Sequence, residues 1–218
     1  MLESFWIASS SFLAALTGAV VPGPVFALVL SESLKSGRAS GPLIILGHFL
    51  IECVVVLMIF MGLQPSLQSK EIRSIIGYVG GVMLIFVGLK SILDALKVKA
   101  EDALSISSII KRGRTPSYKL VFLGFLTSCS NPYFFLWWLT TGLPIMVNSI
   151  SMAGILGFIS FLVGHAAADL SWFSFVSCSV HEGKRVLNEK TLQAVLFGSS
   201  LFLIFFAAYI IFSAASVG

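Results

Sequence analysis

Two stretches of this chain place ionisable side chains in the same pattern inside long apolar runs. His48 and Glu52 stand four residues apart in the first stretch, and His165 and Asp169 repeat that spacing in the second. Residues four apart lie on one face of an α-helix, and imidazole with carboxylate can exchange protons or hold a cation. A charge in the middle of a membrane costs about 3 kcal/mol on insertion scales, so such residues usually face a cavity or a partner. Either histidine could instead serve as a hydrogen bond between helices.

The apolar runs around these residues are long enough to span a membrane. The chain has 218 residues, of which 57% are hydrophobic and only 11% charged, whereas soluble domains are about 25% charged. Runs of about 18 or more apolar residues predict transmembrane helices. We predict six of them, at about 5–30, 42–63, 74–93, 118–143, 151–177 and 192–214. The expected class is an all-α polytopic membrane protein with one transporter domain, 1–218.

The two His/acid stretches also indicate an internal repeat. The first predicted helix contains "PGP" at 22–24 and the fourth contains "NP" at 131–132, while "LIF" recurs in the third and sixth helices. Because each half has three helices, the second half must insert upside down. We therefore predict two inverted three-helix repeats, at about 1–95 and about 118–218, joined by a cytoplasmic linker at about 96–117. Inverted repeats with broken helices are typical of secondary transporters.

The prolines predict where helices 1 and 4 break. A proline has no N–H and leaves the carbonyl four residues earlier without its helical partner. Asn131 is a good N-cap for a restarted helix, and Gly23 is a weaker one. Such a start presents N–H groups to an anion; the alternative is a simple proline kink. We predict one substrate site formed by both breaks and both ionisable pairs: Pro22, Gly23, Pro24, His48, Glu52, Asn131, Pro132, His165 and Asp169.

The two carboxylates are the predicted proton carriers. Burial favours the neutral form of a carboxylic acid, which suits Glu52 and Asp169 for proton exchange. The other polar residues of the predicted helices, Ser128 among them, are interpreted as structural because Ser and Thr often bond back to their own helix. The aromatic run "YFFLWWL" at 133–139 is interpreted as lipid-facing or packing surface.

The distribution of Lys and Arg predicts the orientation. The loops after helices 1, 3 and 5 carry most of the basic residues, whereas the loop after helix 2 carries only Lys70 and Arg73. The positive-inside rule then places the basic loops in the cytoplasm and both termini outside the cytoplasmic membrane. The basic stretch 111–114 reports orientation or contact with anionic lipid rather than nucleic acid. Close-approach glycines in helix 3 fit either a neighbouring helix or a homodimer contact.

Two segments resemble the signatures of the lysine exporter family, the LysE/RhtB-type amino-acid exporters. "PGP" followed by Gly37, Gly41 and Gly47 is similar to the N-terminal signature, and "GFLTSCSNPYFFLWW" from Gly124 is similar to the second. The resemblance implies export of amino acids or related small solutes, driven by the membrane potential or the proton gradient. This chain departs from the family pattern at Ile51, often Gly, and at Tyr133, often Lys.

A divalent-metal exporter is the main alternative. The ligands would be His48, Glu52, His165 and Asp169, since imidazole with carboxylate suits several transition metals. An enzyme is not expected, because the chain has no HExxH, GxSxG or nucleotide-binding loop. We expect no cofactor; the expected partners are a small-molecule substrate and the lipid bilayer.

Overall fold

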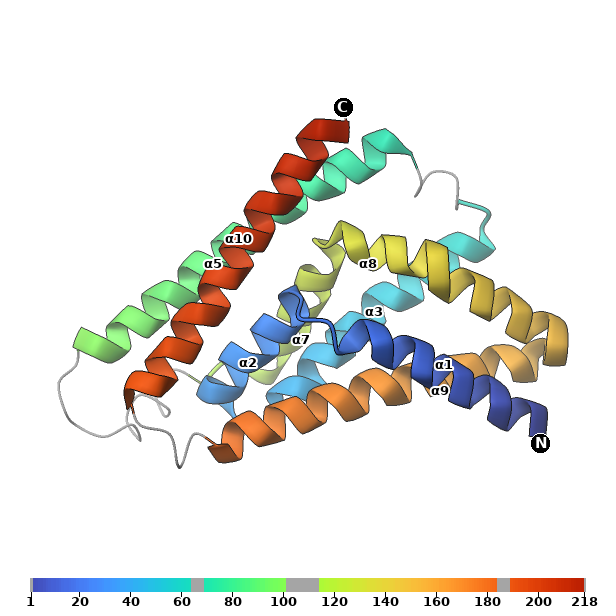
Figure 1. The fold of residues 1–218 in the computed structure, drawn as a ribbon, viewed down its shortest axis with the longest axis horizontal. Helices are drawn as coiled ribbons and strands as arrows, with labels where there is room; N and C mark the ends of the chain where they lie inside the picture. Colours follow the sequence, from blue (N-terminus) through green and yellow to red (C-terminus); the bar gives the residue numbers. More distant parts are fainter. Residues whose placement is uncertain (1, 64–68, 101–113, 184–188, 218) are drawn as a thin grey trace.

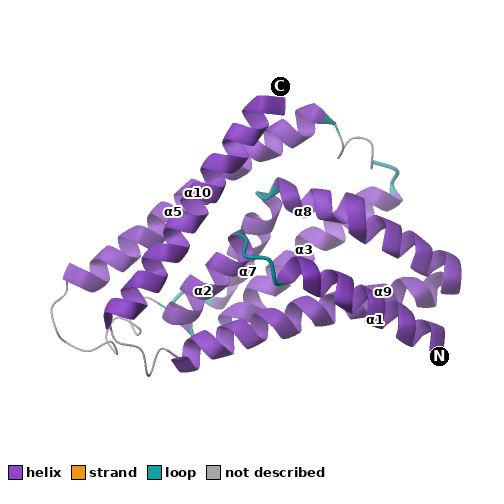
Figure 2. Cartoon of the chain, in the orientation of Figure 1, coloured by secondary structure: helices purple, strands orange, loops and turns teal. Residues whose placement is uncertain are grey.

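The structure is a computed structural model that describes residues 2–63, 69–100, 114–183 and 189–217. Within these ranges the chain forms helices and no strand, which confirms the all-α class (Figure 1, Figure 2). The helices are α1 (Leu2–Ala19), α2 (Pro24–Ser36), α3 (Ser40–Phe60), α5 (Lys70–Ala100), α7 (Ser117–Cys129), α8 (Pro132–Trp137), the π-helical turn η1 (Trp138–Gly142), α9 (Leu143–Gly183) and α10 (Glu189–Val217). Residues 101–113, most of the predicted linker, lie outside the described residues.

The helices are long and apolar enough for a multi-pass membrane protein. Among the described residues, four stretches qualify by length and composition: Ser40–Phe60, Lys70–Lys90, Pro132–Gly183 and Phe197–Ser216. The pair α1 and α2 makes a fifth when it counts as one span bent by 77°. The six predicted spans differ from this count because Pro132–Gly183 counts here as one stretch, although the non-helical residues Ala153 and Gly154 divide it.

The chain reverses inside α9 rather than at a separate loop. Ala153 and Gly154 have non-helical backbone angles, and Gly154 has a positive φ of 55°. A positive φ is unfavourable for residues with a side chain but not for glycine. Figure 1 shows α9 folding back on itself at this turn, so that its second part runs beside α1. The turn falls within the predicted fifth span, 151–177, near its start.

The helices pack in three neighbouring pairs. α1 lies against α9, α3 against α7, and α5 against α10. In Figure 1, α5 and α10 form a separate layer along one side of the molecule. Two glycines allow close crossings of these helices. A methyl group on Gly47 of α3 would overlap the carbonyl oxygen of Val121, and one on Gly164 of α9 would overlap that of Ala8. These crossings fix α3 and α9, which carry the ionisable pairs.

A cluster of polar side chains joins the end of α2 to the residues just before α7. The hydroxyl of Thr115 donates to Glu32 Oε2 over 2.7 Å, and Lys35 Nζ lies 3.6 Å from Glu32 Oε1. The backbone N–H of Thr115 donates to Ser36 Oγ over 2.9 Å. Glu32 is buried, and these partners satisfy its charge. The cluster ties the start of the second half of the chain to α2.

Candidate functional site

The first helix break lies between α1 and α2. α1 ends at Ala19 and α2 begins at Pro24, with Gly23 as an extended N-cap that makes no side-chain hydrogen bond to the helix. The carbonyl of Gly18, which cannot pair with Pro22, accepts instead from the Val21 N–H over 3.3 Å. The first N–H groups of any helix lack partners inside that helix. The start of α2 therefore presents uncapped backbone donors.

The second break lies between α7 and α8, and it is capped. α7 ends at Cys129 and α8 begins at Pro132. Asn131 Oδ1 accepts from the Tyr133 N–H over 3.1 Å, which confirms Asn131 as the N-cap. The Asn131 carbonyl also accepts from the Phe134 N–H over 3.0 Å. Because its own cap occupies these donors, this helix start offers an anion fewer free N–H groups than α2 does.

The four predicted ionisable residues form one cluster between α3 and α9. His165 Nε2 lies 2.6 Å from Glu52 Oε1 and 3.5 Å from Asp169 Oδ2. His48 Nε2 lies 3.2 Å from Glu52 Oε1 and 3.7 Å from Asp169 Oδ2. Glu52, His165 and Asp169 are buried, and the side chain of His48 is only 15% exposed. The two stretches that repeat in the sequence therefore meet in space.

Ser128 fixes the orientation of the His48 ring. Ser128 Oγ donates to the Gly124 carbonyl over 2.9 Å and lies 2.7 Å from His48 Nδ1. The direction of the hydrogen bond between Ser128 Oγ and His48 Nδ1 depends on which ring nitrogen of His48 carries the proton. In either case Nε2 of His48 faces the oxygens of Glu52 and Asp169. A shared proton or a bound cation at this position would reduce the repulsion between the two carboxylates.

His165 has a different environment from His48. Its ring lies among Trp137, Trp138 and Phe161, with ring centroids 5.2, 5.4 and 5.9 Å away. Its Nδ1 is buried and has no hydrogen-bond partner among the described residues. Its Nε2 carries the short contact to Glu52. His165 is thus held by aromatic packing on one side and by Glu52 on the other.

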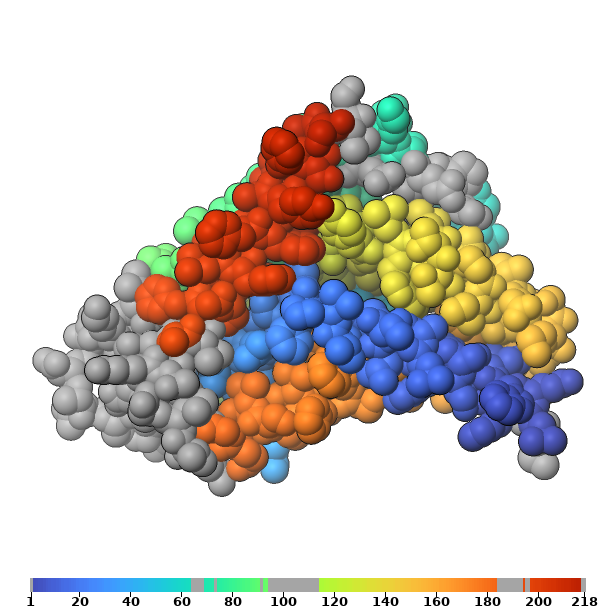
Figure 3. Space-filling view, viewed as in Figure 1, coloured from blue at the N-terminus to red at the C-terminus, as the bar shows by residue number. Residues whose placement is uncertain are grey.

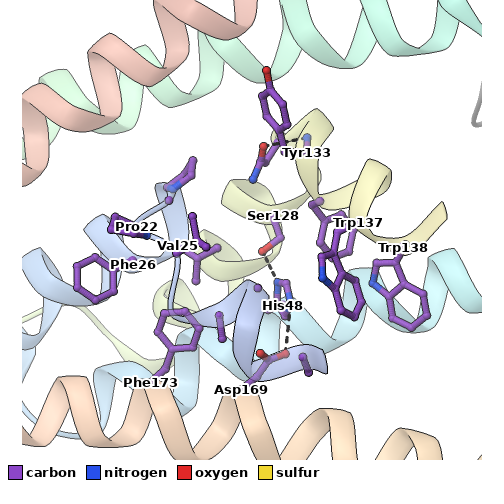
Figure 4. A pocket seen from close by; sticks show the side chains of 18 of the residues that line it. Pro22, Val25, Phe26, His48, Ser128, Tyr133, Trp137, Trp138, Asp169 and Phe173 are labelled. Carbon is purple, nitrogen blue, oxygen red and sulfur yellow. Dashed lines mark hydrogen bonds and ion pairs between the residues drawn. The ribbon is translucent and has the colours of Figure 1, made fainter. Parts of the chain in front are cut away.

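A cavity of about 510 Å³ joins the two breaks and the cluster. Ligand sites commonly have volumes of roughly 300–1,000 Å³. Figure 4 shows His48 in contact with Ser128 and Asp169, with Pro22, Val25 and Phe26 on one side and Trp137 and Trp138 on the other. All predicted site residues except Pro132 line it: Pro22, Gly23, Pro24, His48, Glu52, Asn131, His165 and Asp169.

Several lining residues were not predicted from the sequence. Ser128, interpreted as structural, touches both the cavity and His48. The run 133–139 does pack in the core through Phe134, Phe135 and Trp138, but Tyr133, Phe134, Trp137 and Trp138 also line the cavity. Phe206 and Tyr209 of α10 complete the lining. The sequence analysis noted Tyr133 only as a departure from the family pattern and did not assign it to the cavity.

Both helix breaks and the four ionisable residues of the cluster lie in a segment that a known family shares. The profile of the family described as LysE type translocator matches residues 16–214. The chain belongs to this family. The resemblance to the lysine exporters is thereby confirmed, and the chain is one of a family of membrane translocators. Family membership agrees with the expectation of a transporter rather than an enzyme.

One curated relative covers most of the chain. It is the "Putative amino acid efflux protein YcgF" of Bacillus subtilis (strain 168), 24% identical over 191 residues. The match spans 86% of this chain and 86% of that protein. No solved structure matches the chain.

Proposed function

We propose that this LysE translocator exports amino acids or related small zwitterionic metabolites across the cytoplasmic membrane. The family membership and the name of the YcgF relative support an exporter of this class. The observation that carries the substrate class is the cavity, which contains two carboxylates near one wall and an uncapped helix start at another. A zwitterion has an ammonium group that can bind the carboxylates and a carboxylate group that can bind the helix start.

The α-carboxylate of the substrate binds at the start of α2. Pro24 begins this helix, and the N–H groups of Val25 and Phe26 in its first turn have no partner inside the helix. Both residues line the cavity. The helix dipole adds partial positive charge at the same place. Asn131 lines the cavity from the second break and adds a side-chain amide donor.

The α-ammonium group binds at the ionisable cluster. Asp169 Oδ2 has no partner closer than 3.5 Å in that cluster, whereas Glu52 Oε1 lies 2.6 Å from His165. Asp169 is therefore the carboxylate more available to an incoming ammonium. Glu52 and Asp169 also carry the coupling proton, because two buried carboxylates in one cluster favour a shared proton when no cation is bound. The proton gradient or the membrane potential drives export.

Inverted symmetry between the halves explains how one cavity can be reached from both sides. The crossing of α3 with α7 at Gly47 and Val121 matches the crossing of α9 with α1 at Gly164 and Ala8. A second matched pair has the same separations along the chain. A methyl group on Gly124 would overlap the Ile44 carbonyl, and Ser11 Oγ donates to the Phe161 carbonyl over 2.7 Å. Rocking of matched halves about a central site is the usual transport mechanism of such repeats.

A divalent metal ion is the second candidate substrate. Ligand atoms of His48, Glu52 and Asp169 all lie within 4.8 Å of one another, close enough to surround one ion. The hydrogen bond from His48 Nδ1 to Ser128 would orient Nε2 toward that ion, as metal-bound histidines commonly require. The uncapped start of α2 has no role in this alternative.

A binding and transport screen tests the proposal. The purified protein is mixed with free amino acids, with their methyl esters and with Mn²⁺, Co²⁺, Ni²⁺ or Zn²⁺, and its melting temperature is measured. We expect free amino acids to stabilise the protein and esters to stabilise it far less. Efflux of the stabilising amino acid from proteoliposomes should follow. Stabilisation by a metal alone, with metal transport in proteoliposomes, would establish the metal alternative instead.

The orientation in the membrane follows from the basic loops. With these loops in the cytoplasm, the junctions between α2 and α3 and between α9 and α10 face inward, and both termini face outward. The polar cluster of Glu32 and Thr115 then lies at the cytoplasmic end. Export requires this end to open toward the substrate pool inside the cell.

A further inference from the structure

One wall of the cavity is aromatic and comes largely from α10. Phe206 and Tyr209 line the cavity from this helix, and Tyr133 lines it from the start of α8. The rings of Tyr133 and Tyr209 stack at 7° with centroids 6.2 Å apart, and Tyr133 also contacts Phe206 with centroids 6.1 Å apart. In Figure 3, α10, the region of the α1–α2 break and α8 meet on one face of the molecule. The aromatic wall lies where these three segments join.

The aromatic wall stands across the cavity from the acidic cluster. Figure 4 shows Tyr133 at the end of the cavity far from Asp169, with His48 and Ser128 between them. Phe26 and Phe173 line the side that contains the start of α2. A ligand whose charged groups lie at Asp169 and at the start of α2 therefore projects its remaining atoms toward rings.

The aromatic wall offers no charged side chain to a ligand. Among the described residues that line the cavity, the only acidic or basic side chains are the four of the cluster, His48, Glu52, His165 and Asp169. A charged group that loses water without a partner is strongly disfavoured. A side chain with a charge at its end would meet this penalty against Phe206 and Tyr209, whereas an apolar side chain would gain from burial.

Resting on the proposed function, we propose that the substrates are amino acids with aromatic or large aliphatic side chains. The α-ammonium and α-carboxylate groups bind at Asp169 and at the start of α2, and the side chain packs against Phe206, Tyr209 and Tyr133. Aromatic pairs add about 0.5–1.5 kcal/mol beyond the area that they bury, so ring-bearing side chains bind best. A cavity of about 510 Å³ would be left mostly empty by alanine or glycine.

The experiment compares ligands that differ only in their side chains. Binding of L-phenylalanine, L-leucine, L-alanine and L-lysine to the purified full chain is measured by calorimetry. We expect L-phenylalanine and L-leucine to bind at least about tenfold more tightly than L-alanine or L-lysine. Phe206→Ala and Tyr209→Ala should each weaken L-phenylalanine binding by about five- to tenfold and change L-alanine binding little.

The same helix offers matched controls. Phe205 and Phe212 are 71% and 72% exposed and do not line the cavity. Phe205→Ala and Phe212→Ala remove a ring of the same size from α10 and should leave L-phenylalanine affinity unchanged. If Phe206→Ala does not fold, Phe206→Leu keeps the apolar volume, and its loss for L-phenylalanine should exceed its loss for L-leucine.

The outcomes separate this inference from the function on which it rests. Binding of L-lysine or L-alanine as tight as that of L-phenylalanine, with esters still failing to bind, overturns the side-chain preference and leaves amino-acid export standing. Failure of every free amino acid to bind overturns both. Equal losses in the wall variants and in the control variants overturn the placement of the side chain against α10.

Discussion

The distances in the ionisable cluster predict different roles for its two carboxylates. Glu52 Oε1 lies 2.6 Å and 3.2 Å from the Nε2 atoms of His165 and His48, whereas Asp169 Oδ2 lies 3.5 Å and 3.7 Å from the same atoms. Glu52 makes its shortest hydrogen bond to His165. The two carboxylates are nearly equally buried, with side chains 9% and 7% exposed, so burial does not distinguish them.

The matched perturbation is Glu52→Gln against Asp169→Asn, since each removes one charge and keeps the shape. A hydrogen bond to a charged group contributes about 1.5–3 kcal/mol, and one between neutral groups about 0.5–1.5 kcal/mol. Glu52→Gln should therefore destabilise the protein by about 1–3 kcal/mol, because it weakens two contacts to histidine. Asp169→Asn, which breaks no short contact, should change stability by less than about 1 kcal/mol.

Ligand affinity should respond in the opposite order. If the substrate ammonium binds Asp169, loss of that charge removes about 1.5–3 kcal/mol and weakens binding about 10- to 100-fold. The assay is thermal unfolding of both variants in detergent, followed by calorimetry with the tightest-binding free amino acid. A larger affinity loss in Glu52→Gln, together with a larger stability loss in Asp169→Asn, would refute the assignment. If both variants transport normally, neither carboxylate takes part in transport, and both have a structural role.

Three further predictions concern the helix start, the crossings and the orientation. Gly23→Ser should weaken amino-acid binding by about five- to tenfold in calorimetry, because the hydroxyl caps the N–H groups of α2; Gly23→Ala is the control, since an added methyl group there meets no atom closer than 3.8 Å. Gly47→Ala or Gly164→Ala should lower stability in thermal unfolding by about 1–3 kcal/mol through overlap with a carbonyl of the neighbouring helix. Gly198→Ala, with no atom within 4 Å of the added methyl group, should not, and equal effects at all three sites would contradict the packing argument. In a cysteine-free background, Ser216→Cys but not Ser117→Cys should react with an impermeant reagent in intact cells; the reverse result would invert the topology.

The sequence alone was enough to predict the features that depend on a few neighbouring residues. Apolar runs predicted membrane helices, because a helix of about 20 residues satisfies its own backbone in lipid. Pro24 and Pro132 begin α2 and α8, since proline lacks the N–H that would continue the preceding helix. The spacing of His48 and Glu52, and of His165 and Asp169, predicted that each pair shares a helix face. The inverted repeat itself stays a prediction.

The sequence predicted the reversal between the fourth and fifth spans a few residues too early, at about 144–150 rather than at Ala153 and Gly154. Pro144, Asn148 and Ser149 interrupt the apolar run just before the turn, whereas Ala153 and Gly154 themselves give a weak signal because glycine is common in membrane helices. Only the packing of the second part of α9 against α1 requires the chain to reverse there. The end of the predicted fourth helix at 143 was therefore too early, and helix continues through η1 into α9.

The partners within the cavity were decided by tertiary structure. Sequence spacing places His48 next to Glu52, yet the shortest contact of Glu52 is with His165 on another helix. Ser128 meets His48, and Tyr209 meets Tyr133, only because α3 crosses α7 and α10 passes the start of α8. The residue types along the chain determined where helices span the membrane, break and restart, because backbone hydrogen bonds in a helix join residues only one turn apart. Which side chains share the cavity depended on how closely the helices approach, and that is set by packing between residues far apart in the chain.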